Sequence, residues 1–259
     1  MSHGICLLSV VSCRKEASNS SEMVTQLLFG ETYQITEETE EWFRIITSYD
    51  SYECWLNKKQ HNPLSEKTYQ QIHKSKTFCN GDLVQVIKNK NLNTNIPITV
   101  GANLPLLDKN EMKFDHFHFA FDGTVVDTSI KNEAQKIVQT AYLFLNSPYL
   151  WGGKNPFGID CSGFSQLVYK LNGHKLPRDA SQQVEIGSPL SFVEESEGGD
   201  LAFFDNEEGR VVHVGILLDN QTIIHASGQV RIDKFDHYGI FHSEIKKYSH
   251  NLRVIKRIL

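Results

Sequence analysis

Short runs of alternating apolar and polar residues, separated by polar turns, fill the first quarter of the chain. Strand-like runs occupy residues 27–35, 41–46 and 52–56, and the acidic turn 37–40 separates the first two. Alternation with a period of two residues is typical of strands that bury one face. Short strands at near-regular spacing predict a small β-barrel over residues 1–60.

The pattern changes twice before residue 131. Residues 61–77 are polar, with Pro63 and several Lys and Gln, which predicts a linker that can include a short helix. Alternation returns at 82–87 and 117–121. We therefore expect a second, more divergent barrel over residues 78–130.

Helical spacing begins at residue 132. One apolar stripe runs along 132–146, formed by Ala134, Ile137, Val138, Ala141 and Leu145. This helix should end near Ser147, because the residue before a proline disfavours helix. The same spacing predicts a second helix over 161–171.

The last third of the chain alternates again. Strands are predicted at 201–204, 211–218, 222–227, 229–235 and 252–258. Residues 131–259 therefore predict an α+β domain in which helices pack against one antiparallel sheet. Between two of these strands, residues 234–250 are rich in aromatic residues and histidine, and we expect His237, His242 and His250 at the surface.

Composition narrows the class of protein. The chain has 259 residues, of which 40% are apolar and 22% charged, as in an ordinary globular protein. A net charge of −5 gives no indication that the protein binds nucleic acid or an anionic membrane. No run approaches the ~20 apolar residues of a spanning helix. We expect a monomer that has no membrane span and needs no cofactor.

Five cysteines without paired spacing argue for reduced thiols and a cytoplasmic setting. The absence of a Cys-x-x-Cys pair also argues against zinc, so no metal is expected. An alternative concerns residues 5–13, which could form a short lipoprotein signal with Cys13 acylated, placing the protein in the periplasm or on a lipid anchor. No Lys or Arg precedes this run, which favours an ordinary strand.

Candidate chemistry centres on Cys161. It follows a Gly- and Pro-rich loop and opens the second predicted helix. A helix N-terminus carries partial positive charge and unpaired N–H groups, so the pKa of a thiol placed there should fall. A free cysteine can also be an inert buried residue, and one cysteine before one helix does not decide between the two interpretations.

Two histidines downstream favour catalysis. His213 interrupts the apolar run 211–218 and His225 interrupts 222–227, with a polar turn between them. Adjacent antiparallel strands can bring the two rings side by side. A thiol nucleophile needs a base, and the base needs a third group to fix its tautomer. Cys161, His213 and His225 supply one residue for each role.

The motifs around these residues resemble the NlpC-type cysteine peptidases, bacterial enzymes with a papain-like core that cut cell-wall peptides. The resemblance spans about residues 133–259 and rests on Tyr-x-Trp-Gly-Gly, Asp-Cys-Ser-Gly-Phe, Leu-Pro-Arg-Asp-Ala-Ser-Gln-Gln, Gly-Asp-Leu-Ala-Phe-Phe, His-Val-Gly-Ile and Ile-Ile-His-Ala. It implies Cys161 as nucleophile, His213 as base and His225 as the orienting residue. The first barrel similarly resembles a bacterial SH3 domain, with Cys54 in place of a usual glycine.

The same resemblance implies a set of oxyanion and substrate contacts. Tyr149 would help to hold the oxyanion, and the other contacts would be Trp151, Asp160, Ser162, Arg178 and Ser181. Relatives with two SH3-like domains cut γ-D-glutamyl–diamino acid bonds in peptidoglycan stem peptides that carry a free N-terminal L-Ala. Asp160 and Tyr52 would then meet the substrate ammonium, with Glu22 or Glu53 as a further acidic partner.

This resemblance implies recycling of freed peptides. Alternatives remain open at this stage: remodelling of intact wall, a wall-binding module with a vestigial peptidase, an acyltransferase on the same scaffold, and a zinc hydrolase that uses the histidines.

Overall fold

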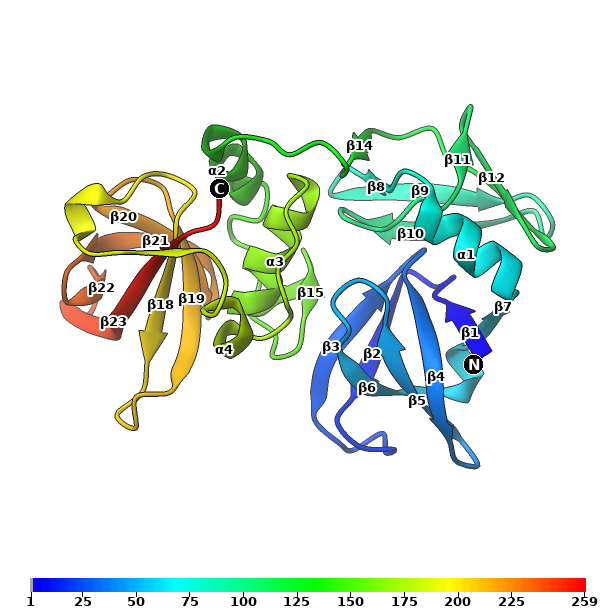
Figure 1. The fold of residues 1–259 in the computed structure, drawn as a ribbon, viewed down its shortest axis with the longest axis horizontal. Coiled ribbons are helices and arrows are strands. Elements are labelled where there is room, and N and C mark those ends of the chain that lie inside the picture. Colours follow the sequence, from blue (N-terminus) through cyan, green and yellow to red (C-terminus); the bar gives the residue numbers. More distant parts are fainter. Residues whose placement is uncertain (1) are drawn as a thin grey trace. The chain divides into compact units, whose positions relative to one another are not determined.

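A computed structural model describes residues 2–259 (Figure 1). The chain divides into two compact units. The first contains the chain up to Ile130 together with Gly152–Pro156, and the second contains Lys131–Trp151 and Phe157–Leu259. Among the described residues, no helix is long and apolar enough to span a membrane.

The first unit opens with a seven-stranded antiparallel sheet in the order β3-β2-β6-β5-β4-β1-β7. Its strands are β1 (Ser2–Ile5), β2 (Val10–Arg14), β3 (Met23–Leu28), β4 (Thr32–Glu38), β5 (Trp42–Thr47), β6 (Glu53–Asn57) and β7 (Asn62–Leu64). A buried apolar cluster fills it, formed by Cys6, Val11, Cys13, Leu27, Tyr33, Ile45, Cys54 and Leu56. Residues 5–13 are not one strand: they contain the last residue of β1, a non-strand segment and most of β2, and Cys13 lies inside β2 and within this core.

The run 27–35 is two strands, and the prediction of one was wrong. The chain turns at Gly30, where φ is +77° and an added Cβ would lie 2.2 Å from the carbonyl oxygen of Asn103. Only glycine adopts this conformation in so little space. The alternation continues through the turn, so the hydrophobic pattern alone does not reveal it.

The segment 61–77 is more ordered than a linker. After the 3₁₀ turn η1 (Lys58–Gln60), β7 pairs with β1 and completes the first sheet. Helix α1 (Glu66–Lys74) follows, with Ser65 as its N-cap. The Asp115 carboxylate accepts hydrogen bonds from Ser65 and Thr68 at 2.6 Å, which ties this helix to the second sheet.

The second sheet of this unit is built from short strands. Its five strands run in the order β10-β9-β13-β12-β11, and β8 pairs separately with β14. They are β8 (Phe78–Asn80), β9 (Val84–Asn89), β10 (Thr94–Thr99), β11 (Leu107–Asp108), β12 (Glu111–Phe114), β13 (Phe117–Ala120) and β14 (Val125–Asp127). Ile87, Ile98, Met112 and Phe119 are fully buried within it.

A closed barrel dominates the second unit. Seven strands run in the order β17-β23-β18-β19-β20-β21-β22, and a further pairing of β22 with β23 closes the sheet. They are β17 (Ser188–Leu190), β18 (Leu201–Asp205), β19 (Val211–Leu217), β20 (Thr222–Ser227), β21 (Gln229–Asp236), β22 (Gly239–His242) and β23 (Lys247–Arg257). The sequence predicted an antiparallel sheet but not its closure, because β22 and the first half of β23 fall in the stretch 234–250 that has no clean alternation.

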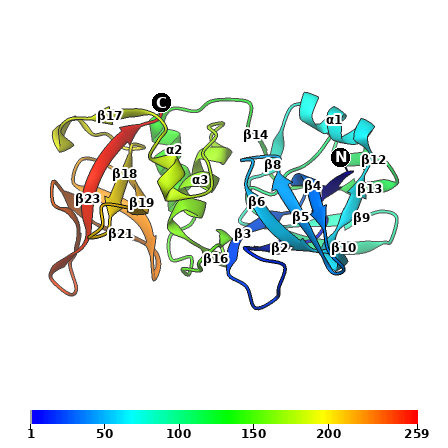
Figure 2. The ribbon, with the colours of Figure 1, turned by 60° about the horizontal axis from the view of Figure 1, so that its bottom comes forward.

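The helices of this unit lie together on one side of the barrel strands (Figures 1 and 2). They are α2 (Ala134–Tyr142), α3 (Cys161–Leu171) and α4 (Ala180–Gln183). The same unit contains the short elements β16 (Gly158–Ile159) and η2 (Val193–Glu195), whereas β15 (Lys154–Asn155) belongs to the first unit. Helix α3 contacts α2, β19 and β20, and every one of its residues is buried. Helix α2 ends earlier than predicted: Asn146 has a φ of +68°, and Leu145 is exposed instead of lying on the stripe.

Candidate active site

Cys161 is the first residue of α3, as the sequence predicted. Asp160 is the N-cap, and its carboxylate accepts the Gly163 N–H at 2.6 Å. This bond satisfies one of the unpaired donors at the helix start and fixes the chain direction there. The Cys161 side chain is 7% exposed. The backbone N–H groups of Val214 and Ser162 hydrogen-bond its sulfur, so the thiol lies beside β19 at the residue that follows His213.

The predicted lowering of the thiol pKa at the helix terminus is not found. Burial, with a smaller contribution from the neighbouring Asp160 carboxylate, raises the pKa of Cys161 to about 12. The Val214 and Ser162 N–H groups and the Arg178 guanidinium act in the opposite direction but are outweighed. A desolvated site disfavours the charged thiolate. At neutral pH the resting nucleophile is therefore the thiol.

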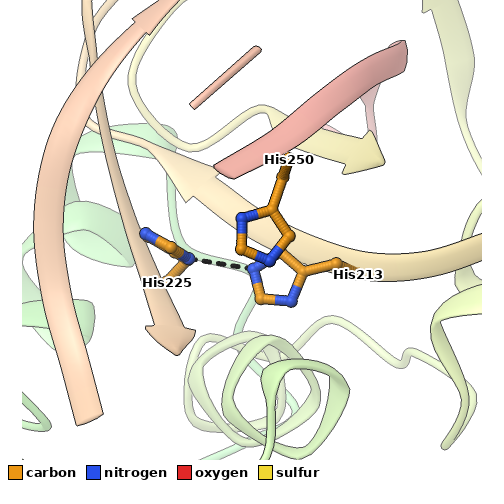
Figure 3. Close-up of side chains that lie close together, drawn as sticks. All are labelled: His213, His225 and His250. Atoms are coloured by element: carbon orange, nitrogen blue, oxygen red, sulfur yellow. Dashed lines mark hydrogen bonds between the residues drawn. The ribbon is translucent and has the colours of Figure 1, made fainter. Parts of the chain in front are cut away.

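His213 and His225 form one hydrogen-bonded pair. His213 lies on β19 and His225 on the adjacent antiparallel strand β20, and the Nε2 and Nδ1 atoms of the two rings are 2.9 Å apart (Figure 3). Their rings meet edge to face, with planes at 88°. Both are buried, and burial is the main cause that lowers the pKa of each ring. The pair is neutral at pH 7.

Gly215 makes room for this pair. It lies opposite His225 in the ladder between β19 and β20. A Cβ at this position would come within 2.9 Å of the His225 Cβ and 2.6 Å of the Ile223 side chain. The glycine two residues after His213 in the His-Val-Gly motif is therefore required by packing against the second histidine.

Four further residues of the predicted site gather around the thiol. Arg178 is buried and binds both oxygens of Asp160, at 3.0 and 2.6 Å, while its NH1 also donates to Ser162 Oγ at 2.9 Å. A bidentate pair of this kind fixes the carboxylate orientation. Tyr149 is half-buried, and its hydroxyl interacts electrostatically with Cys161, Asp160 and Arg178. Burial raises the Tyr149 pKa to about 12, so the hydroxyl stays a donor at neutral pH.

Other predicted contacts lie outside this cluster. Trp151 is 60% exposed. Ser181 is exposed at the start of α4 and lines a groove of about 830 Å³ with Val211 and Val212, the two residues before His213. Tyr52 belongs to the first unit, where it packs on the first barrel's core. Their contacts with substrate stay predictions.

The two acidic candidates of the first barrel already have cationic partners. Glu22 lies 3.3 Å from Lys15, and Glu53 pairs with Arg44. Either carboxylate would have to exchange that partner for a substrate ammonium.

Sequence reasoning missed three residues of the site. Asp233 on β21 accepts from His225 Nε2 at 3.0 Å, and Arg231 donates to both oxygens of Asp233. Their alternation on the strand after His225 was the available signal. His250 on β23 stacks on His213, with ring centroids 4.1 Å apart (Figure 3). The expectation of a surface His250 was wrong, because β23 closes the barrel beside the catalytic pair.

The three histidines bring ring nitrogens within 4.8 Å of one another, the only such metal-capable group among the described residues. His213 and His225 bond to each other, and His225 also bonds to Asp233. A metal ion shared by these rings would require them to turn away from these partners. The arrangement supports acid–base work by the imidazoles more directly than metal ligation.

The chain matches two family models. Residues 146–247 match the NlpC/P60 family, and residues 13–60 match the bacterial dipeptidyl-peptidase SH3 domain. The chain is 33% identical over 218 residues to the gamma-D-glutamyl-L-lysine dipeptidyl-peptidase of Bacillus subtilis, covering 78% of this chain and 71% of that protein. It is 27% identical to dipeptidyl-peptidase 6 of Lysinibacillus sphaericus, covering 90% and 92%.

A solved structure shares the whole fold. An NlpC/P60 family protein from Bacillus cereus superposes with a TM-score of 0.82 at 19% identity and covers 99% of both chains. The likeness confirms the α+β architecture with its β-rich N-terminal region. The 33% identical relative and the family match, with the site built on Cys161, show that the chain belongs to the NlpC/P60 family and is a cysteine peptidase.

Proposed function

We propose that this peptidase hydrolyses the γ-D-glutamyl–diamino acid bond of peptidoglycan stem peptides and acts on substrates with a free N-terminal L-Ala. The observation that carries the chemistry is the hydrogen-bonded histidine pair on β19 and β20, beside a thiol at the start of α3. The choice of bond rests on relatives named gamma-D-glutamyl-L-lysine dipeptidyl-peptidase in two Bacillus species. A dipeptidyl-peptidase releases the first two residues of a peptide, which fits a free amino end.

The reaction proceeds through a thioester. The Cys161 sulfur attacks the γ-carbonyl carbon of the glutamyl residue while its proton passes to His213. The charged oxygen that forms is stabilised by the Cys161 backbone N–H, at the open end of α3, and by the Tyr149 hydroxyl. His213 then gives its proton to the amine of the departing diamino acid. Water, deprotonated by the same ring, cleaves the thioester and restores the thiol.

Both reacting groups are neutral before substrate binds. Burial raises the pKa of Cys161 and lowers that of His213, so a thiolate–imidazolium pair is disfavoured at rest. Proton transfer therefore accompanies attack on the carbonyl. A general base in this role contributes a rate factor of about 10²–10⁴.

The carboxylate of Asp160 supports recognition of the substrate ammonium. It is buried next to Cys161, and Arg178 balances its charge from one side. An ammonium that approaches Asp160 would displace water from a carboxylate whose orientation is already fixed. N-acetylation of the substrate removes the positive charge and should abolish this interaction.

Peptide recycling in the cytoplasm is the proposed setting. It follows from the proposed preference for a free amino end, because peptides still joined to the glycan through L-Ala lack that amine. The five free cysteines fit a reducing compartment. Remodelling of intact wall and acyl transfer to an acceptor other than water are the alternative functions. The alternative location of the protein is the periplasm or a lipid anchor.

The test uses the tripeptide L-Ala-γ-D-Glu-diaminopimelate, its L-lysine counterpart, and N-acetylated copies of both. Wild-type protein should release L-Ala-γ-D-Glu from the free peptides only, and Cys161→Ala should release nothing. Cys79→Ala, which removes another buried thiol, is the matched control and should stay active. Equal cleavage of the acetylated peptides, or release of peptides from purified cell wall, would favour wall remodelling instead. Transfer to an added amine in preference to water would favour an acyltransferase.

A further inference from the structure

A chain of charged and polar groups extends from the base into the barrel. Asp233 is buried on β21, and its Oδ2 accepts from Arg231 Nε at 2.7 Å and from His225 Nε2 at 3.0 Å. Arg231 also donates through NH2 to Asp233 Oδ1 at 3.0 Å. Burial opposes ionisation of Asp233, but the bonds from His225 and Arg231 outweigh it and hold the pKa at about 2. The carboxylate is therefore charged at every working pH.

An ionised carboxylate accepts hydrogen bonds and cannot donate them. The contact between Asp233 Oδ2 and His225 Nε2 therefore places a proton on that nitrogen. A neutral imidazole carries one ring proton, so the Nδ1 of His225 keeps its lone pair. That lone pair faces the Nε2 of His213, which must then be the donor of the 2.9 Å bond between the rings.

The same rule, that a neutral imidazole carries one ring proton, identifies which nitrogen of His213 is the base. His213 carries its single proton on Nε2, and its Nδ1 keeps the lone pair. In Figure 3 this second nitrogen points away from His225. We propose that Asp233, clamped by Arg231, is a positioning residue that sets the ring protons of both histidines, so that the Nδ1 of His213 receives the Cys161 proton.

Other titratable and polar groups surround the histidine pair. His250 stacks on His213, and its Nδ1 is engaged with Ser249 Oγ at 2.9 Å. His242 and Arg231 are the other charged or titratable groups whose fields act on His225 besides Asp233. When His213 becomes protonated during the reaction, Asp233 supplies negative charge from the far side of the His225 ring without moving.

The inference rests on the cysteine-peptidase chemistry proposed above and is tested with two variants. Asp233→Leu removes both acceptor oxygens, whereas Asp233→Asn retains one that His225 can still use. We expect kcat to fall by about 100-fold in the first and by less in the second, with KM nearly unchanged. A purely structural role would change the folded fraction but leave kcat per folded molecule as in wild type, which would overturn the proposal.

The same domain offers a matched control. Asp200 accepts from Arg257 at 3.0 and 2.8 Å in another bidentate pair, and it bonds the Glu197 N–H instead of a histidine. Asp200→Leu should lower thermal stability while the folded protein keeps its kcat. If Asp200→Leu and Asp233→Leu lose kcat equally, Asp233 has no specific role.

Two readouts do not depend on the substrate. Alkylation of Cys161 by iodoacetamide, followed by peptide mass spectrometry, should be slower at neutral pH in Asp233→Leu than in wild type. In a His225→Ala background the Asp233 substitution should add nothing, because Asp233 acts through that ring. If wild type cleaves no γ-glutamyl peptide, the substrate assignment fails, yet these alkylation results still decide the positioning role.

The ring protons can also be observed directly. In ¹⁵N-histidine-labelled wild type, NMR should show His213 and His225 both protonated at Nε2 and unprotonated at Nδ1. Asp233→Leu should give mixed or reversed tautomers. Reversed tautomers in wild type would contradict the proposal, whatever the kinetics.

Discussion

The imidazole of His250 lies flat against that of His213, with centroids 4.1 Å apart and planes at 24°. It also meets His225 edge to face, with centroids at 5.7 Å. One face of the base is therefore covered by a second ring from the last strand of the barrel. This cover keeps water from that face and limits rotation of His213 about its side-chain bonds.

Replacement of His250 should separate ring packing from ring chemistry. His250→Phe retains a flat ring over His213 and should keep kcat within about twofold. His250→Ala removes it and should lower kcat by up to about tenfold, since an aromatic pair contributes about 0.5–1.5 kcal/mol. Steady-state kinetics on the tripeptide measure both. Equal activity in His250→Ala and wild type would contradict a positioning effect of the stack.

The histidine cluster should also make stability depend on pH. Burial, followed by the field of His225, lowers the pKa of His250 to about 4, and burial lowers those of His213 and His225. These rings bind protons more readily in the unfolded chain, so stability is full above pH 6.5 and falls as pH decreases toward 4. Asp233, with a pKa of about 2, extends the loss below pH 4.

Urea unfolding at several pH values measures this slope. His250→Phe removes one titrating ring and should flatten the slope between pH 6.5 and 4 by up to one proton, or about 1.4 kcal/mol per pH unit. An unchanged slope in this variant would mean that His250 titrates alike in the folded and unfolded chains.

The local sequence pattern was sufficient to predict the position of the nucleophile, but it did not predict the residues that pack around the catalytic site. The start of α3 was predicted from a Gly- and Pro-rich loop followed by an apolar stripe, and the structure begins the helix at Cys161 as predicted. Strands β19 and β20 follow from two apolar runs around one polar turn, which also brought His213 and His225 together.

The parts that sequence reasoning missed depend on distant pairing. His250 becomes half-buried only because β22 pairs with β23 and closes the barrel, and nothing in residues 234–250 alternates clearly enough to predict that. The high pKa of Cys161 depends on burial by other elements, which local helix electrostatics cannot anticipate. Asp233 acquires a role only when β21 pairs with β20 and presents its carboxylate to His225.

A buried ion pair should stabilise the first unit. Lys154 Nζ lies 2.9 Å from Glu31 Oε2, and the two side chains are 6% and 4% exposed. Lys154→Met removes the cation that balances a buried carboxylate and should cost about 3–5 kcal/mol of unfolding free energy. Adding Glu31→Gln should recover much of this loss, because the amide oxygen can still accept the Leu28 N–H.

The control for this pair is an exposed one in the same unit. Lys15 and Glu22 lie 3.3 Å apart with side chains 65% and 40% exposed. Lys15→Met should change the unfolding free energy by less than about 1 kcal/mol. Urea denaturation of the full chain compares all variants, and similar losses in Lys15→Met and Lys154→Met would contradict a special cost of the buried charge.

Asp160 should influence the thiol and the substrate in opposite directions. Its carboxylate raises the Cys161 pKa, so Asp160→Asn should lower that pKa and speed alkylation by iodoacetamide at neutral pH. Asparagine can still cap α3 by accepting the Gly163 N–H, so the helix start should persist.

If Asp160 also binds the substrate ammonium, cleavage of the free tripeptide should fall in the same variant, mainly through a higher KM. Unfolding would expose all five buried thiols, so faster alkylation confined to Cys161 in the peptide mass spectrum, together with slower cleavage, would support both roles. Faster alkylation with unchanged KM would remove Asp160 from substrate recognition and leave the preference for a free amine to other residues.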